Sequence, residues 1–163
     1  MLTKKYQCRA SILCLPHCST LETIDISGFD TSAVTDLGQL FQSCIALTTI
    51  VGLDTLNTTS ATRFIKMFYN CSALTEIDIS SFDASKVVYA GNMFGLCKNL
   101  TTIYAKAGTD WSSIATLTSS TDMFADCANL KGGANTVYDS SKTDKSYAHI
   151  DGGTEAPGYF TEK

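Results

Sequence analysis

Five cysteines recur along the sequence at intervals of 26 to 30 residues, and each is followed three residues later by a leucine. The cysteines are Cys18, Cys44, Cys71, Cys97 and Cys127, and the leucines are Leu21, Leu47, Leu74, Leu100 and Leu130. A period of this length is typical of proteins built from stacked repeats. Because one repeat cannot bury its own apolar face, the sequence predicts an array in which each repeat packs against its neighbours.

Each repeat begins with the alternation of a half-buried strand. In residues 21–27, Ile24 and Ile26 alternate with polar residues, and residues 74–80 repeat the pattern. Apolar residues at every second position turn one face toward a core and the other toward solvent. We therefore expect a short parallel strand in every repeat.

A second periodicity follows each strand. Val34, Leu37, Leu40, Phe41 and Cys44 are spaced like one apolar stripe on a helix. The same spacing returns later as Ala61, Phe64, Met67, Phe68 and Cys71, and as Val87, Ala90, Met93, Phe94 and Cys97. The pattern predicts a short helix after each strand.

These elements together predict an α/β fold: a right-handed solenoid of leucine-rich-repeat type, with a short parallel strand and a short helix in each coil. Residues 1–20 would form an incomplete first coil or an N-terminal cap, and residues 21–130 about four repeats. Residues 131–163 depart from the pattern and end in the aromatic pair Tyr159 and Phe160. We expect them to form a C-terminal cap over the exposed end of the array.

The five periodic cysteines are predicted to be a ladder of small buried side chains. Equivalent positions in adjacent coils would lie about 4.8 Å apart with parallel side-chain vectors, which suits a disulfide poorly. Cys8 and Cys14 lie outside the register, and they are plausible disulfide partners for each other.

The repeat resembles that of the BspA-like leucine-rich repeat surface proteins. The resemblance lies in residues 67–85, Met-Phe-Tyr-Asn-Cys-Ser-Ala-Leu-Thr-Glu-Ile-Asp-Ile-Ser-Ser-Phe-Asp-Ala-Ser, and in residues 29–36. Residues 147–153 and 157–161 are similar to the C-terminal block of the same family. The resemblance implies surface or secreted proteins of host-associated bacteria and some protists, which adhere to host proteins or to other cells. It transfers no catalytic residue.

The expected function is therefore a non-enzymatic protein-interaction or adhesion module of a bacterial surface or secreted protein. Its partner would be a protein or glycan on a host or bacterial surface. Residues 1–8 lack the apolar stretch and cleavage site of a secretory signal, so we expect the module to reach the surface as part of a longer exported chain. The alternative is a structural spacer or stalk segment of a larger surface or virion-type assembly, with no ligand of its own.

The outward face of the strands is the predicted binding surface, because repeat arrays use such extended faces for partners. The residues expected on it are Thr23, Asp25, Ser27, Thr49, Val51, Glu76, Asp78, Ser80, Thr102 and Tyr104. They would form one continuous patch, with Tyr104 beside Val51 as an aromatic anchor.

Catalytic and metal-binding patterns are weak in this sequence. His17 and His149 are the two histidines and lie near opposite ends of the array, so they support no Ser–His–Asp or Cys–His set. The spacing of Cys8, Cys14, His17 and Cys18 matches no common zinc pattern. We expect no enzyme activity, no cofactor and no metal.

Aspartates at equivalent strand positions offer a possible calcium site or acid–base pair. Asp25 and Asp78 are equivalent, with Glu76 nearby, but Val51 and Tyr104 interrupt the row. Calcium also needs six to eight oxygen ligands. Solvated carboxylates are the better interpretation.

Charge and hydropathy limit the remaining partners. The formal net charge is −4, and no basic cluster is longer than Lys4-Lys5, which argues against nucleic acid. No apolar run approaches the ~20 residues of a membrane-spanning helix. The sequence leaves the oligomeric state open.

Overall fold

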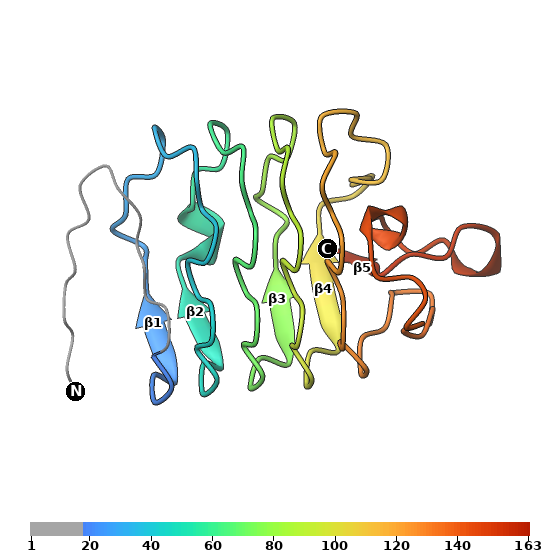
Figure 1. Ribbon diagram of the computed structural model, residues 1–163, viewed down its shortest axis with the longest axis horizontal. Helices are drawn as coiled ribbons and strands as arrows, with labels where there is room; N and C mark the ends of the chain where they lie inside the picture. The colour runs from blue at the N-terminus through green and yellow to red at the C-terminus, as the bar shows by residue number, and fades with distance from the viewer. Residues whose placement is uncertain (1–17) are drawn as a thin grey trace.

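The structure is a computed structural model and describes residues 18–163. Successive repeats lie side by side, so that β1 to β4 follow one another along the molecule and the C-terminal segment lies at one end (Figure 1). The strands are β1 (Thr23–Asp25), β2 (Thr49–Val51), β3 (Glu76–Asp78), β4 (Thr102–Ala105) and β5 (Phe160–Glu162). Three short 3-10 helices complete the elements: η1 (Leu53–Thr55), η2 (Lys145–Tyr147) and η3 (Gly153–Glu155).

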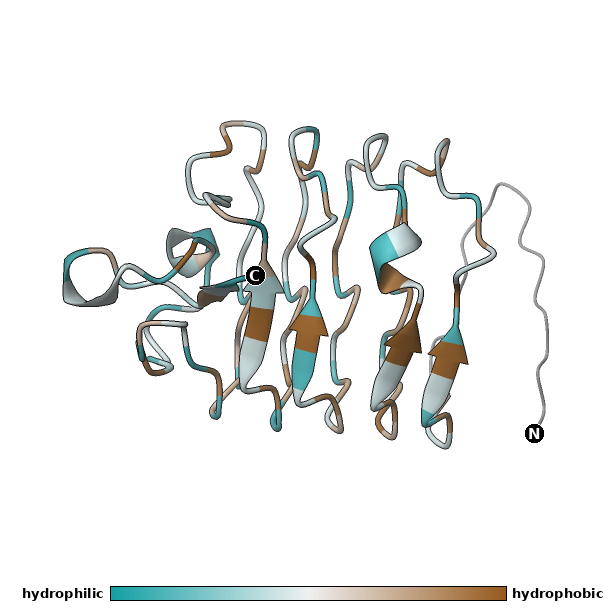
Figure 2. Ribbon diagram, turned by 180° about the vertical axis from the view of Figure 1, so that it is seen from behind, coloured by the Kyte–Doolittle hydropathy of each residue, from teal (hydrophilic) through white to brown (hydrophobic). Residues whose placement is uncertain are grey.

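The strands form two small parallel sheets, one of β1 and β2 and one of β3, β4 and β5. Isoleucines occupy the centres of the first four strands, with Ile24 opposite Ile50 and Ile77 opposite Ile103. Each of these strands accordingly carries a hydrophobic stretch, which in β2 continues into Val51 at the end of the strand (Figure 2). Ile77 and Ile103 are buried, so the predicted alternation does turn apolar side chains inward.

The predicted fold class is wrong. Residues 18–163 contain no α-helix, and the segments expected to be helical, such as residues 34–44, are turns and single β-bridges. The repeats do not show one strand plus one helix each, and the described chain forms two small sheets in place of the solenoid of leucine-rich-repeat type.

Hydrogen bonds explain why these segments are not helices. Every second residue donates its backbone N–H to the next repeat: Gln39 to Ile65 O at 2.8 Å and Phe41 to Met67 O at 2.9 Å. The residues between them close local turns, as Cys44 N does on Phe41 O at 3.2 Å. A helix would instead satisfy all of these N–H groups within its own segment. Repeated three-residue turns produce nearly the same apolar spacing as a helix, which is why the sequence pattern was misleading.

Left-handed backbone at two residues in each turn segment makes this arrangement possible. These residues are Gln39, Ser43, Lys66, Asn70, Asn92, Leu96, Asp122 and Asp126. This conformation costs an L-residue about 1–2 kcal/mol, with Asn and Asp tolerating it best. The first six donate their N–H to the following repeat, and these bonds offset the cost.

The same segments form a second ladder of backbone contacts. Parallel bridges join Asp36 to Arg63, Arg63 to Tyr89, and Tyr89 to Ser119. This ladder runs through four repeats without interruption, unlike the strands.

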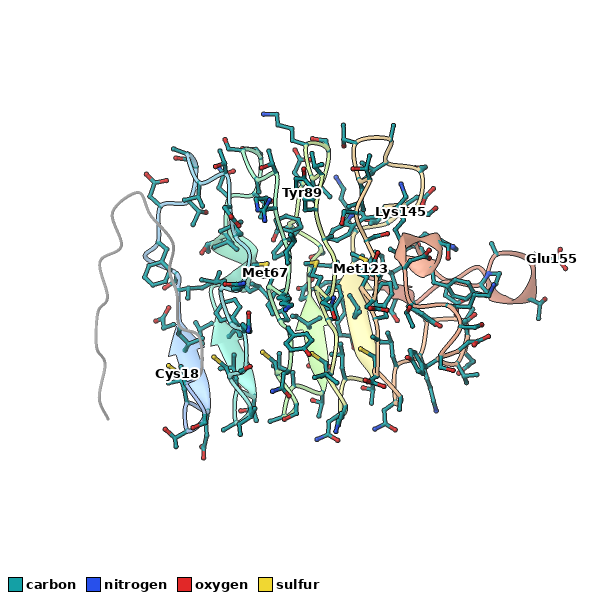
Figure 3. The ribbon with its side chains drawn as sticks, in the orientation of Figure 1. Cys18, Met67, Tyr89, Met123, Lys145 and Glu155 are labelled. Carbon is teal, nitrogen blue, oxygen red and sulfur yellow. The ribbon has the colours of Figure 1, made fainter. Side chains whose placement is uncertain are left out.

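The core is a column of stacked phenylalanines, one from each repeat. Phe41, Phe68, Phe94 and Phe124 are fully buried, and neighbouring ring centroids lie 5.4–5.7 Å apart with interplanar angles of 4–13°. The methionines that precede three of them are buried as well, and Figure 3 shows Met67 and Met123 in the interior of the stack. Each added repeat therefore extends one continuous apolar column.

The periodic cysteines form the predicted buried ladder. Cys44, Cys71, Cys97 and Cys127 are fully buried, and Cys18 is half-buried. The thiols of Cys71, Cys97 and Cys127 each lie 3.0–3.1 Å from the carbonyl oxygen of the phenylalanine one repeat earlier. Each cysteine thus fills a small space and links two repeats. The expected Cys8–Cys14 pair lies outside the described residues.

The C-terminal segment takes the place of a further repeat. Phe124 donates its N–H to Thr143 O at 2.9 Å and Asp126 donates to Tyr138 Oη at 3.0 Å, and the Tyr159 ring packs edge-on against Phe124. Strand β5 pairs with β4, Phe160 lying opposite Ile103. In the inner repeats the backbone N–H groups at these positions donate to the next repeat. The C-terminal segment therefore supplies the acceptors that a further repeat would supply. The division into residues 1–20, 21–130 and 131–163 stays a prediction.

One buried carboxylate organises this segment. Asp151 accepts hydrogen bonds from Ala134 N at 2.8 Å, from Thr136 N and Oγ1, and from Gly153 N at 2.9 Å. Burial works to raise the pKa of Asp151, but the hydrogen bonds from Thr136 and Gly153 outweigh it, and the pKa is lowered. The carboxylate therefore stays ionised and holds three loops together.

Removing one ring from the column should destabilise the whole stack. We expect Phe68→Ala to lower the free energy of unfolding by about 3–5 kcal/mol, the range for a buried phenylalanine. The exposed Lys98→Ala should change it by less than about 0.5 kcal/mol. Urea denaturation followed by circular dichroism measures both, and equal losses would contradict the assignment of the core.

The thiol ladder predicts a loss of stability at alkaline pH. Burial raises the pKa of Cys97 to about 12, and it raises the pKa of Cys71 and Cys127 as well. Because the unfolded chain loses these thiol protons near the ordinary value of 9.0 while the folded chain keeps them, the free energy of unfolding should fall as pH rises above 9.0.

Urea denaturation between pH 7 and 11, in a reducing buffer, tests this expectation. The decrease above pH 9 should be shallower in Cys97→Ala than in the unchanged chain, because one buried thiol has been removed. Identical slopes in the two proteins would show that the buried thiol does not contribute.

Candidate functional site

The structure arranges the predicted face residues in two rows across the strands. The first row contains Thr23, Thr49, Glu76 and Thr102, and the second contains Asp25, Val51, Asp78 and Tyr104. Ser27 and Ser80 follow β1 and β3 and donate hydrogen bonds to Asp25 and Asp78. All ten side chains are exposed or half-buried. Whether they bind a partner stays a prediction.

The expectation of one continuous patch is wrong. β2 pairs with β1 and β3 pairs with β4, but no pairing joins β2 to β3 in the part of the chain that the structure describes. Figure 1 shows β2 and β3 further apart than β1 and β2. The face is therefore divided into two patches.

A one-residue insertion accounts for this break. Four positions separate Asp25 from Phe29, whereas five separate Val51 from Leu56 at the equivalent place. Gly52 takes up the extra residue with φ 81°, and η1 begins directly after it. The extra residue therefore changes the path of the chain directly after β2, whereas the bridge from Arg63 to Tyr89 keeps the second ladder in register.

The break leaves a groove between the two sheets. Its volume is about 180 Å³, and its lining residues are Thr48, Ile50, Leu53 and Asp54 from the β2 side and Leu74, Glu76, Ile77 and Asp78 from the β3 side. Ligand pockets usually measure about 300–1,000 Å³, so this groove is small for a cofactor. It is the size of one or two amino-acid side chains, with aliphatic walls and three carboxylates.

Opposite charges meet beside the groove. Lys163 Nζ forms an ion pair with Asp78 Oδ2, linking the residue after β5 to β3. Burial works to raise the pKa of Asp78, but hydrogen bonds from Lys163 and Ser80 outweigh it and lower that pKa. The hydrogen bond to Asp78 raises the pKa of Lys163, and the charges of Asp78 and Asp54 add to this. The acidic side of the groove thus favours an ammonium group.

The second predicted carboxylate, Asp25, has a local structural role. It accepts hydrogen bonds from Ser27 N at 3.0 Å and Ser27 Oγ at 2.6 Å, which lower its pKa. Asp25 therefore shapes the turn after β1. It lies on the other sheet from Asp78, so the structure does not bring these two carboxylates together as an acid–base pair.

A family model described as "Mycoplasma protein of unknown function, DUF285" matches residues 14–137. The chain belongs to the DUF285 family. No curated protein matches it, and no solved structure does.

The DUF285 match spans β1 to β4 and both sides of the groove, whereas β5 and Lys163 lie beyond its end. The groove is therefore made by the part of the chain that defines the family. The ion pair from Lys163 to Asp78 is added by the C-terminal segment.

Between residues 18 and 163, no three His, Cys, Asp or Glu side chains gather closely enough to hold a metal ion. His149 is half-buried in the C-terminal segment, with Nδ1 3.0 Å from Ile150 O, and His17 lies outside the described residues. No helix in the described residues is long and apolar enough to cross a membrane.

Sequence reasoning named Glu76 and Asp78 but missed the opposite wall, Ile50, Leu53 and Asp54. A signal for that wall is the extra residue at Gly52, but the sequence around it does not show that β2 and β3 separate. The separation depends on where the next repeat lies.

Substitution of Gly52 should strain the backbone and disturb the groove. A Cβ added there would lie 2.5 Å from Ser27 Cα and N, and its φ is already in the left-handed region. We expect Gly52→Ala to cost at least about 2 kcal/mol. Thermal and urea unfolding measure the change.

Two other glycines serve as controls that distinguish the cost of left-handed backbone from the cost of a steric clash. Gly108 has φ 73° but no atom within 4 Å of an added Cβ, and Gly28 has neither feature. Gly108→Ala should cost about 1 kcal/mol, and Gly28→Ala should be neutral. If Gly52→Ala lowers the free energy of unfolding no more than Gly108→Ala does, the close contact between Gly52 and Ser27 is contradicted.

Proposed function

We propose that this DUF285 protein is a non-enzymatic interaction or adhesion module related to the BspA-like surface proteins, and that it binds through its strand face. The partner would be a protein or glycan on a host or bacterial surface. The observation that carries the proposal is the pair of exposed rows on β1 to β4, interrupted by a groove with unpaired strand edges. Such edges are ready to accept another chain unless something covers them.

One exposed and one half-buried side chain support binding by this face. Val51 is 45% exposed at the edge of the first sheet, and Tyr104 lies in the same row on β4. Aromatic residues contribute strongly at protein interfaces. The proposal therefore gives Tyr104 the role of anchor on the second sheet and Val51 that of a separate apolar contact across the groove on the first.

The proposal is tested by binding of the purified chain to extracellular-matrix proteins, mucins and intact bacterial cells. The double variant Val51→Lys/Tyr104→Ala should weaken saturable binding by about 30-fold, which corresponds to ~2 kcal/mol. Tyr89→Ala is the matched control, because Tyr89 is 40% exposed but belongs to the second ladder. It should leave binding unchanged.

Two results would contradict the proposal. Binding that Tyr89→Ala and the double variant reduce equally would place the contact elsewhere. Absence of binding to every member of the panel would favour the spacer or stalk segment.

A further inference from the structure

The two strands that flank the groove have their hydrogen-bonding edges turned toward it. Elsewhere the strands are joined by regular bonds: Thr48 N donates to Glu22 O at 2.9 Å, and Thr101 N donates to Thr75 O at 2.8 Å. In residues 18–163 the corresponding bond between Thr75 and Thr48 is not formed. The missing bonds lie between strands that run in the same direction, as the arrows of β1 to β4 show (Figure 2).

Contacts beside the gap fix the position of the two repeats relative to each other. The second ladder stays closed across the same two repeats, because Arg63 bridges Tyr89 and Phe64 N donates to Tyr89 O at 2.7 Å. Phe68 and Phe94 also remain stacked at 5.7 Å. The strands thus separate within a rigid frame, so the groove is formed before any partner arrives and little ordering is needed on binding.

The groove combines apolar walls with one sign of charge. Ile50, Leu53 and Ile77 supply aliphatic surface, while Asp54, Glu76 and Asp78 supply carboxylates. Lys163 shows that this side accepts an ammonium, because its Nζ pairs with Asp78. A lysine or arginine side chain has the matching character, since its stem packs on apolar surface and its charged end reaches the carboxylates.

We propose that the β2–β3 groove binds an extended, basic segment of a protein partner by strand addition. The partner backbone bonds to the open edge of β2 or β3, and one lysine or arginine side chain enters the groove beside Asp54 and Glu76. This inference rests on the proposed function and specifies the partner. Main-chain bonds provide affinity in this mode, and the side-chain pocket provides selectivity.

Selection from a displayed library of random ten-residue peptides tests the inference on the folded chain at physiological salt. Enriched peptides should carry lysine or arginine at a constant position among β-branched residues. Binding of a synthetic enriched peptide, followed by fluorescence anisotropy, should weaken at least about tenfold in Asp54→Lys/Glu76→Lys, because attraction becomes repulsion. Glu76→Gln keeps the size of the side chain and should give a smaller loss.

The control is Glu155→Lys, which makes the same reversal of charge at a single residue. Glu155 lies at the far C-terminal end of the molecule, away from β3 (Figure 3), and its variant should bind within about twofold of the unchanged chain. The same peptide with alternate backbone nitrogens methylated should lose at least about tenfold, because it cannot donate to a strand edge. Unfolding curves confirm that each variant is folded.

Several outcomes would overturn the inference. They are the absence of enriched peptides, enrichment of acidic peptides, equal weakening by Glu155→Lys, or full binding by the methylated peptide. If the surface panel still binds and only Val51→Lys/Tyr104→Ala weakens it, strand addition is wrong while the adhesion proposal stands. If the panel shows no binding but basic peptides bind in the groove, the adhesion proposal is wrong while strand addition stands.

Discussion

Backbone hydrogen bonds between neighbouring repeats are the interaction on which the rest of this structure depends. In each turn segment alternate residues, such as Gln39 and Phe41, donate to the following repeat, while the residues between them close local turns. No repeat in the described chain can satisfy its polar backbone alone, so the repeats are stable only as a stack. The same bonds set the distance at which Phe41, Phe68, Phe94 and Phe124 meet and form the central column.

This dependence explains why a small irregularity has a large local effect. One extra residue at Gly52 alters the path of the chain after β2. The turn segment that follows in the same repeat cannot shift without losing several hydrogen bonds to the next repeat. The change is therefore confined to the strand side, where it separates β2 from β3 and creates the groove. A position that departs from the repeat thus produces the most distinctive surface on the molecule, while the buried cysteines and phenylalanines continue their regular spacing.

The proposed function follows from the contrast between the turn segments and the strands. The backbone groups of the turn segments bond to neighbouring repeats. The strands present exposed and half-buried rows, open edges and the acidic wall of Asp54, Glu76 and Asp78. The C-terminal segment connects to this surface, since β5 extends the second sheet and Lys163 pairs with Asp78. It also covers the end of the phenylalanine column through Tyr159. The DUF285 family is described as one of unknown function, so the proposed binding chemistry rests on the face itself.

The sequence by itself determined the length of the repeat, the buried positions and the strand centres, because burial requires particular side chains: Cys71, Phe68 and Ile77 lie in the core as their spacing indicates. It also showed that Glu76 and Asp78 would share a face. Only the tertiary structure decided that residues 34–44 form turns, since apolar side chains recur at nearly the same interval in a helix and in successive three-residue turns. The distinction depends on whether a backbone N–H finds its acceptor four residues away or in the next repeat, some 26 residues away. The groove was decided in the same way, because its two walls come from different repeats and meet only when those repeats stack.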